Sequence, residues 1–232
     1  MKLLLEQWRK YLISEAKFDR ETTELSRAII KLFKANAGPM EDFSVNVPVP
    51  DSLSSQLDDI IVEFIFTRDM PSRIEGEYGD RYMKFVVEID PQEDPNTTIS
   101  SWLGNLKGTI RHELEHVLQD ARGEFGDDEG TDFEDVESFL DYYFDPVEIE
   151  AFAAEIYKRA KTEKKPVIVF INDRMDKFVE EAEDFVFLDE LSREDLERHE
   201  KNIRTEIEKN IRERYPSAQF SESWERYLKE GS

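Results

Sequence analysis

Apolar residues recur every three or four positions along the first 35 residues of the chain, the spacing of an amphipathic helix. Two such stripes are present, and Gly38 and Pro39 follow them. The pattern predicts two helices over residues 2–35, forming a hairpin that ends at these two residues. The first stripe comprises Leu4, Leu5, Trp8, Tyr11 and Leu12, and the second comprises Leu25, Ala28, Ile29, Leu32 and Phe33.

The apolar period changes to two between residues 43 and 90, which indicates strands. The alternating segments cover residues 43–49, 60–66 and 83–89. Gly76, Gly79 and Asp80 predict a turn before the last segment, and Pro91 predicts its end. We expect these strands to form a small, mostly antiparallel sheet.

Helical spacing returns in the rest of the chain. A long helix is predicted over residues 98–122 and ends at Gly123, and further helices are predicted at 133–144, 145–161, 192–214 and 224–228. Residues 167–171 fit a strand, but they lead directly into a helical pattern, so we expect one helix over 167–185. The fold class is therefore α+β, with an N-terminal helical hairpin (1–40), a core (41–165) and a helical C-terminal extension (166–232).

Charge and composition narrow the classes of function. The 232 residues include 31 Lys and Arg and 54 Asp and Glu, which gives a net charge of −23. An acidic chain repels polyanions, so we expect no nucleic-acid partner and no anionic membrane surface. No segment approaches the roughly 20 apolar residues that span a bilayer, and the apolar run at residues 1–5 is too short for a secretory signal. We expect a cytoplasmic protein.

The long predicted helix contains the sequence His-Glu-Leu-Glu-His at residues 112–116. His112 and His116 are four residues apart, so their imidazoles lie one turn apart on one face of the helix, an arrangement that tetrahedral zinc can use. Glu113 lies beside them and is placed to act as a general base on a metal-bound water. The opposite side is expected to pack into the core through Leu114, Val117, Leu118 and Ala121.

A catalytic zinc site needs a third protein ligand. The chain has no cysteine, and its one other histidine, His199, lies in a highly charged segment where we expect a surface role. In the extended motif H-E-x-x-H-x-x-G-x-x-H, the glycine and the last histidine would fall on Gln119 and Arg122, which match neither. The third ligand is therefore expected to be a carboxylate.

The best candidate lies in the sequence Asp-Pro-Val-Glu-Ile-Glu-Ala-Phe-Ala at residues 145–153. Together with the H-E-x-x-H motif, it resembles the zincin metallopeptidases whose third ligand is a glutamate of an E-x-x-A sequence on a later helix. These include intracellular peptidases similar to phage-repressor antagonists. The resemblance covers about residues 60–160.

The resemblance implies that His112, His116 and Glu148 bind Zn²⁺ and that Glu113 is the catalytic base. It also implies a zincin-like fold, in which an antiparallel sheet precedes the active-site helix and its edge strand binds extended substrate; residues 83–89 resemble that strand. The family usually places Asp or Asn after the alanine to support a histidine. This chain has Phe152 there, so that support must come from elsewhere.

Other carboxylates compete with Glu148 for the third ligand position. Glu148 is the third residue of a helix opened by Asp145 and Pro146, so it could instead be a capping-box carboxylate. Glu150 flanks the same apolar face. The remaining candidates are Glu134, Glu137 and Asp141.

These observations lead to the expectation of a zinc-dependent metallopeptidase that hydrolyses a protein or peptide substrate. Tyr143 or its neighbour Tyr142 could donate to the oxyanion of the tetrahedral intermediate, or pack in the core. The acidic residues 124–132 could form a lid that favours basic substrates, or a solvated loop.

The N-terminus suggests a second class of function. Residues 1–16 resemble the short leader that directs proteins into the heads of large tailed phages, and Ile13-Ser14-Glu15 before Ala16 fits the cleavage site of the prohead protease. A first helix packed through Leu5, Trp8 and Leu12 is the simpler interpretation. With a genuine leader, the protein would be packaged in a virion. The alternative to an enzyme is a catalytically silent, zincin-like virion or partner-binding protein.

Overall fold

The computed structural model describes residues 2–36, 41–67, 72–90, 92, 95–124, 133, 135–184 and 191–220. Across these residues the fold is α+β, with six helices and a four-stranded sheet. The chain divides into two compact units, Met1–Arg122 and Gly123–Ser232. The α+β prediction is confirmed. The boundary between the units falls at the end of the long helix.

The N-terminal segment is one helix, α1 (Lys2–Asn36), and not the predicted hairpin. No glycine or proline lies between its two apolar stripes, so nothing in the sequence ends the first helix before the second begins. From residue 18 onwards, where its side chains are described, α1 buries Leu25, Ile29 and Phe33. The ring of Phe33 packs at 5.3 Å from that of Phe64 in the sheet.

The sheet contains β1 (Phe43–Asn46), β2 (Asp59–Phe66), β3 (Arg73–Gly79) and β4 (Tyr82–Ile89), in the order β1-β2-β4-β3. Pairing is antiparallel for β1 with β2 and for β3 with β4, and parallel for β2 with β4. The sheet is therefore mixed. Three of its strands match the predicted segments.

Strand β3 was missed by the sequence analysis, which assigned Gly76 to a turn. Only Ile74 and Tyr78 are apolar in this strand, and a glycine between them breaks the alternation. The strand has a consequence for the sheet, because β4 lies between β2 and β3. The expectation that residues 83–89 form the edge strand is therefore wrong, and β3 forms that edge.

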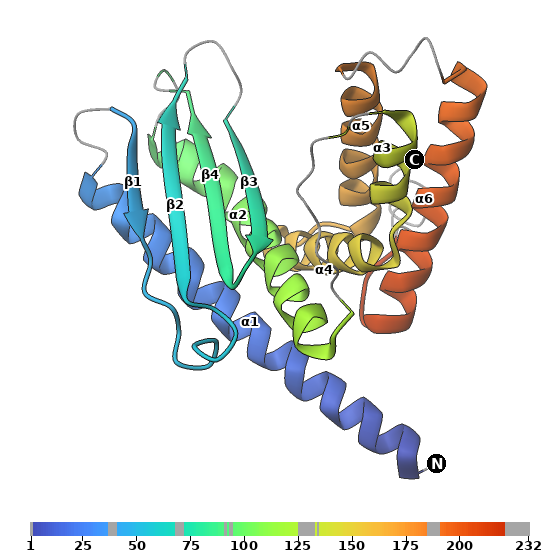
Figure 1. Cartoon of the computed structure of the whole chain (residues 1–232), viewed down its shortest axis with the longest axis horizontal. Coiled ribbons are helices and arrows are strands. Elements are labelled where there is room, and N and C mark those ends of the chain that lie inside the picture. Colours follow the sequence, from blue (N-terminus) through green and yellow to red (C-terminus); the bar gives the residue numbers. More distant parts are fainter. Residues whose placement is uncertain are drawn as a thin grey trace, which may run out of the picture. The chain divides into compact units, whose positions relative to one another are not determined.

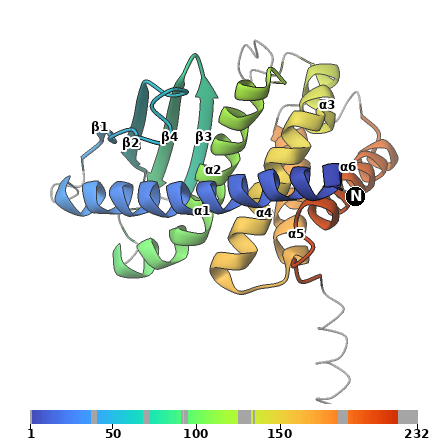
Figure 2. The same ribbon diagram turned by 90° about the horizontal axis from the view of Figure 1, so that it is seen from below.

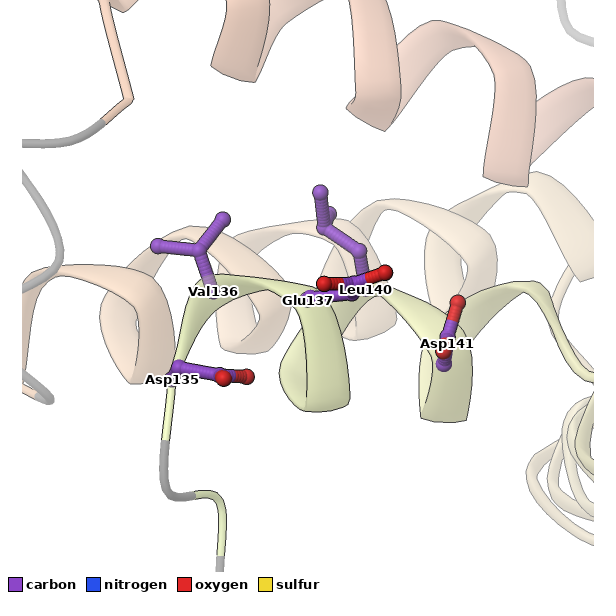
Figure 3. A pocket seen from close by; sticks show the side chains of 5 residues that line it. All are labelled: Asp135, Val136, Glu137, Leu140 and Asp141. Carbon is purple, nitrogen blue, oxygen red and sulfur yellow. The ribbon is translucent and has the colours of Figure 1, made fainter.

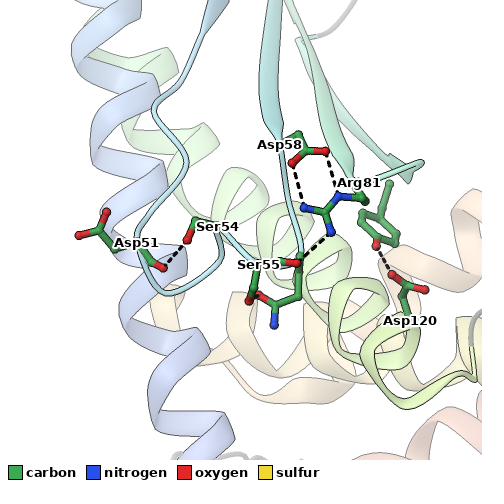
Figure 4. Close-up of polar contacts among 8 residues, drawn as sticks. Asp51, Ser54, Ser55, Asp58, Arg81 and Asp120 are labelled. Carbon is green, nitrogen blue, oxygen red and sulfur yellow. Dashed lines mark hydrogen bonds and ion pairs between the residues drawn. The ribbon is translucent and has the colours of Figure 1, made fainter.

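The turn between β3 and β4 consists of Asp80 and Arg81, with φ values of 42° and 66°. Two central residues with positive φ are typical of the tight turn that matches strand twist. Arg81 is held by the Asp58 carboxylate, which accepts from its Nε and Nη2 at 2.9 Å each, and by the Ser55 carbonyl at 2.9 Å (Figure 4). These contacts fasten the turn to the loop that leads into β2.

Helix α2 (Pro95–Arg122) lies with α1 against one face of the sheet (Figures 1 and 2). That face is buried because strand side chains alternate: Ile60, Val62 and Phe64 of β2 and Met83, Phe85 and Val87 of β4 are at most 1% exposed. The core side of α2 is nearly as predicted. Leu114 and Val117 are buried, whereas Leu118 is half-buried and Ala121 is exposed.

The second unit contains four described helices: α3 (Val136–Phe144), α4 (Pro146–Glu163), α5 (Val167–Asp184) and α6 (Arg193–Arg214). The helical interpretation of residues 167–171 is thus confirmed. The four helices share one core, in which aromatic rings dominate; Phe139 stacks on Phe178 at 5.4 Å, and Tyr157 on Tyr215 at 4.1 Å. The helix predicted at 224–228 lies outside the described residues.

Candidate metal centre

The motif residues lie in the middle of α2, where the helix is almost fully enclosed. The exposed fractions of His112, Glu113 and His116 are 9%, 3% and 4%. Buried polar side chains need polar partners or a ligand, because burial removes the water that would otherwise solvate them. This burial distinguishes the motif from a surface sequence that merely contains two histidines.

The two imidazoles converge on one point. Their Nε2 atoms are 3.0 Å apart, and the rings stand nearly perpendicular at 79°. Two nitrogens of a tetrahedral zinc site with Zn–N bonds of about 2.0–2.1 Å are about 3.3 Å apart, so the observed geometry is close to that of a ligand pair.

Gln119 orients one of these rings. The Nδ1 atom of His116 lies 2.8 Å from Gln119 Oε1. A carbonyl oxygen only accepts, so Nδ1 carries the hydrogen and, in the neutral ring, Nε2 carries the lone pair. This is the support that metal-ligating histidines normally receive. From the sequence, Gln119 was considered only at the glycine position of the extended motif and this role was missed, although its spacing of three residues from His116 places both on one helix face.

A buried ion pair stabilises the same helix. Arg111 Nη1 lies 2.7 Å from Glu115 Oε2, with side chains 5% and 0% exposed. The Arg111 guanidinium also stands over the ring of Phe18 in α1, at 5.3 Å from its centroid. The second glutamate of the motif therefore has a structural contact, which the sequence analysis did not assign.

Glu148 lies in the first turn of α4 and is 5% exposed. The helix begins with Asp145, whose side chain accepts from the Val147 N–H at 2.7 Å, and Pro146 follows. In a capping box, Glu148 would accept from the Asp145 N–H. That N–H donates instead to the Tyr142 carbonyl at 3.3 Å, so this alternative is not supported.

Within the described part of the chain, one group of three His or acidic side chains has the geometry to hold a metal ion: His112, His116 and Glu148. The ligand atoms that they offer all lie within 4.8 Å of one another. Two imidazole nitrogens and one carboxylate oxygen are a donor set that zinc accepts. The residues predicted from the motif and from the resemblance are thus the ones that this group contains.

The competing carboxylates have other surroundings. Glu150 Oε2 lies 3.2 Å from Arg214 Nη1, in an ion pair on the second unit. Glu137 and Asp141 line an open pocket of about 410 Å³ along α3 (Figure 3). Glu134 lies outside the described residues, as do residues 125–132 of the acidic loop.

Tyr143 has a position that does not favour the predicted role as an oxyanion donor. Its side chain is 0% exposed, and its hydroxyl donates to Glu181 Oε2 at 2.5 Å. Burial also raises the pKa of Tyr143 above its usual value. The ring belongs to the aromatic core of the second unit, and Tyr143 has no part in the mechanism proposed below.

The other two residues considered from the sequence, His199 and Tyr142, both belong to the second unit. His199 on α6 contacts the ring edge of Phe144 at 5.6 Å between centroids, and burial lowers its pKa. Tyr142 lies near Glu148: burial, and then the charge of that carboxylate, raise its pKa well above the usual value.

Replacing Gln119 by Leu is expected to weaken zinc binding by about 10- to 100-fold, because loss of the hydrogen bond to His116 Nδ1 frees the ring and its tautomer. The measurement is zinc affinity by competition with a chelating dye. Gln119→Glu, which keeps an acceptor, should retain most of the affinity. Equal affinities for the wild-type chain and Gln119→Leu would contradict the orienting role.

Comparison with known proteins gave no match: no family model, curated protein or solved structure is significantly similar to the chain. Among the described residues, no helix combines the length and the apolarity needed to cross a membrane.

Proposed function

We propose that the protein is a zinc-dependent metallopeptidase whose zinc ligands are His112, His116 and Glu148. The observation that carries the proposal is the convergence of two imidazole nitrogens and a carboxylate within 4.8 Å, beside a glutamate on the same helix as the histidines. The absence of cysteine agrees with this donor set.

Each residue has a distinct part in the proposed reaction. His112, His116 and Glu148 would hold the zinc, which would supply a Lewis acid to polarise the scissile carbonyl and to lower the pKa of a water molecule to near 7. Glu113 would take a proton from that water as the water oxygen adds to the scissile carbonyl carbon, and would pass the proton to the amine nitrogen as the C–N bond breaks. Gln119 holds His116 in the tautomer that presents Nε2.

Strand β3 is the proposed binding edge for the substrate. In the described residues it pairs only with β4, and its Gly76 approaches Glu113 of α2. An extended peptide can add to such an edge through backbone hydrogen bonds. Backbone recognition favours an unfolded protein or a peptide over a small molecule as substrate.

The first test is metal content followed by turnover. We expect purified full-length chain to contain about one zinc, and to cleave a pool of unfolded peptides. A chelator should abolish cleavage, and added zinc should restore it. Cleavage sites are read by mass spectrometry.

A different result would favour the second class of function. A chain that folds without metal, binds no added zinc and cleaves nothing would contradict the proposal. It would instead support a catalytically silent protein that serves as a virion component or binds a partner.

A further inference from the structure

The edge strand β3 lies against α2, the helix that carries the H-E-x-x-H motif, through alternate residues. At one end of the contact, the Tyr78 hydroxyl donates to Asp120 Oδ2 of α2 at 2.7 Å (Figure 4). Gly76, two residues earlier on β3, meets Thr109 and Glu113. These three positions of α2 lie on one helix face, since Glu113 follows Thr109 by four residues and Asp120 follows Glu113 by seven.

Gly76 leaves no room for a side chain. A Cβ atom built on it would lie 2.5 Å from Glu113 Oε1, 2.8 Å from Glu113 Cγ and 2.7 Å from Thr109 Cγ2. Carbon atoms in contact are normally about 3.5–4.0 Å apart, so all three approaches are too close. The Glu113 side chain therefore occupies the space that any other residue at position 76 would fill.

Neither strand β3 nor helix α2 is free to move away from the other. The Tyr78–Asp120 hydrogen bond holds β3 to α2, and burial raises the pKa of Tyr78, so its hydroxyl stays a donor. Helix α2 is held in the core by buried residues such as Leu114 and Val117, which are 0% and 2% exposed. The part that can yield is the flexible Glu113 side chain.

We propose that Gly76 is a positioning residue for Glu113: its missing side chain creates the space in which the carboxylate is held beside the histidine pair. This role rests on the proposed function, in which Glu113 is the general base. A side chain at position 76 would displace the carboxylate from the water that it must deprotonate. A displacement of about 1 Å at a reacting group can cost about 10²-fold in rate.

The test compares two alanine variants of one strand. Gly76→Ala is expected to lower kcat about 10²-fold, with KM and zinc content unchanged. Gly79→Ala is the matched control, because its Cβ would meet nothing closer than Tyr82 Cε1 at 3.7 Å. It makes the same change in strand propensity without a close contact, so it should keep at least the wild-type Tm, whereas Gly76→Ala should lower Tm.

A double variant separates positioning from a general structural effect. If Gly76 acts through Glu113, adding Gly76→Ala to Glu113→Gln causes no further loss of kcat. A general effect would lower kcat by the same factor in both backgrounds. A second double-mutant cycle measures thermal unfolding. Gly76→Ala should lower Tm less in the Glu113→Ala background than in the wild-type chain, because two of the three close contacts are made by the Glu113 side chain.

The outcomes distinguish this inference from the proposed function. Wild-type kcat in Gly76→Ala, or an equal factor of loss in both backgrounds, overturns the positioning role alone. A chain that binds zinc but cleaves no peptide overturns both. The Tm cycle reports on the contact between Gly76 and Glu113 independently of turnover, and an undiminished Tm loss in Glu113→Ala overturns the positioning role.

Discussion

Replacing Glu113 by Gln is expected to lower kcat by about 10²- to 10⁴-fold while the zinc content stays at about one per chain. Glutamine has the shape of glutamate but cannot accept a proton from water at neutral pH. It also keeps the packing against β3, where the side chain is 3% exposed. Zinc content by elemental analysis and kcat on a defined peptide are the two measurements.

The matched control for this prediction is Glu24→Gln. Glu24 lies on α1, and its exposed side chain pairs with Arg20 at 2.8 Å. The same loss of charge there should change kcat less than twofold. If Glu113→Gln turns over as fast as the wild-type chain, Glu113 is not the general base.

Replacing His112 by Ala is expected to abolish stoichiometric zinc binding. Loss of a residue that only supports a zinc ligand weakens zinc affinity by about 10- to 100-fold, and loss of a ligand itself should weaken it more. Zinc at about 100 times its dissociation constant stabilises a binding protein by about 2.7 kcal/mol. For a chain of this size, that corresponds to a rise in Tm of about 5–10 °C. The rise should be seen in the wild-type chain and be absent in His112→Ala.

His199→Ala is the control for that experiment. It removes a histidine from α6, where the ring contacts Phe144, and should leave both zinc content and the zinc-induced rise in Tm intact. Loss of zinc from both variants to the same degree would contradict the assignment of His112.

The same assay tests the third ligand with an isosteric pair. Glu148→Gln should lose zinc, whereas Glu150→Gln, which weakens the ion pair to Arg214, should keep it. The reverse result would move the third ligand to Glu150.

Most helices and three strands could be predicted because their apolar period is strong. The errors have local causes. Residues 2–35 show two stripes, and the period alone does not tell whether a helix continues between them; the absence of glycine and proline was the stronger signal. Strand β3 has one glycine between its two apolar residues, and it exists because β4 pairs with it.

The candidate site was predictable to the extent that its residues are close in sequence. The spacing of His112 and His116 brings their rings together in any helix, and Glu148 came from a resemblance. The contact of Gly76 with Glu113 joins residues that are distant in sequence and on different elements. No pattern in a single sequence indicates such a pair, since a glycine in a weak strand is equally typical of a turn.

The turn at Asp80 and Arg81 makes the edge strand dependent on a distant part of the chain. Left-handed backbone at two residues other than glycine is locally unfavourable, by about 1–2 kcal/mol each. The contacts of Arg81 with Asp58 and Ser55 offset that cost, and they exist only once the segment before β2 is in place. Residues 73–89 are therefore a poor autonomous hairpin. The turn that joins the strand carrying Gly76 to β4 depends on non-local contacts, so this edge of the sheet is expected to form late in folding.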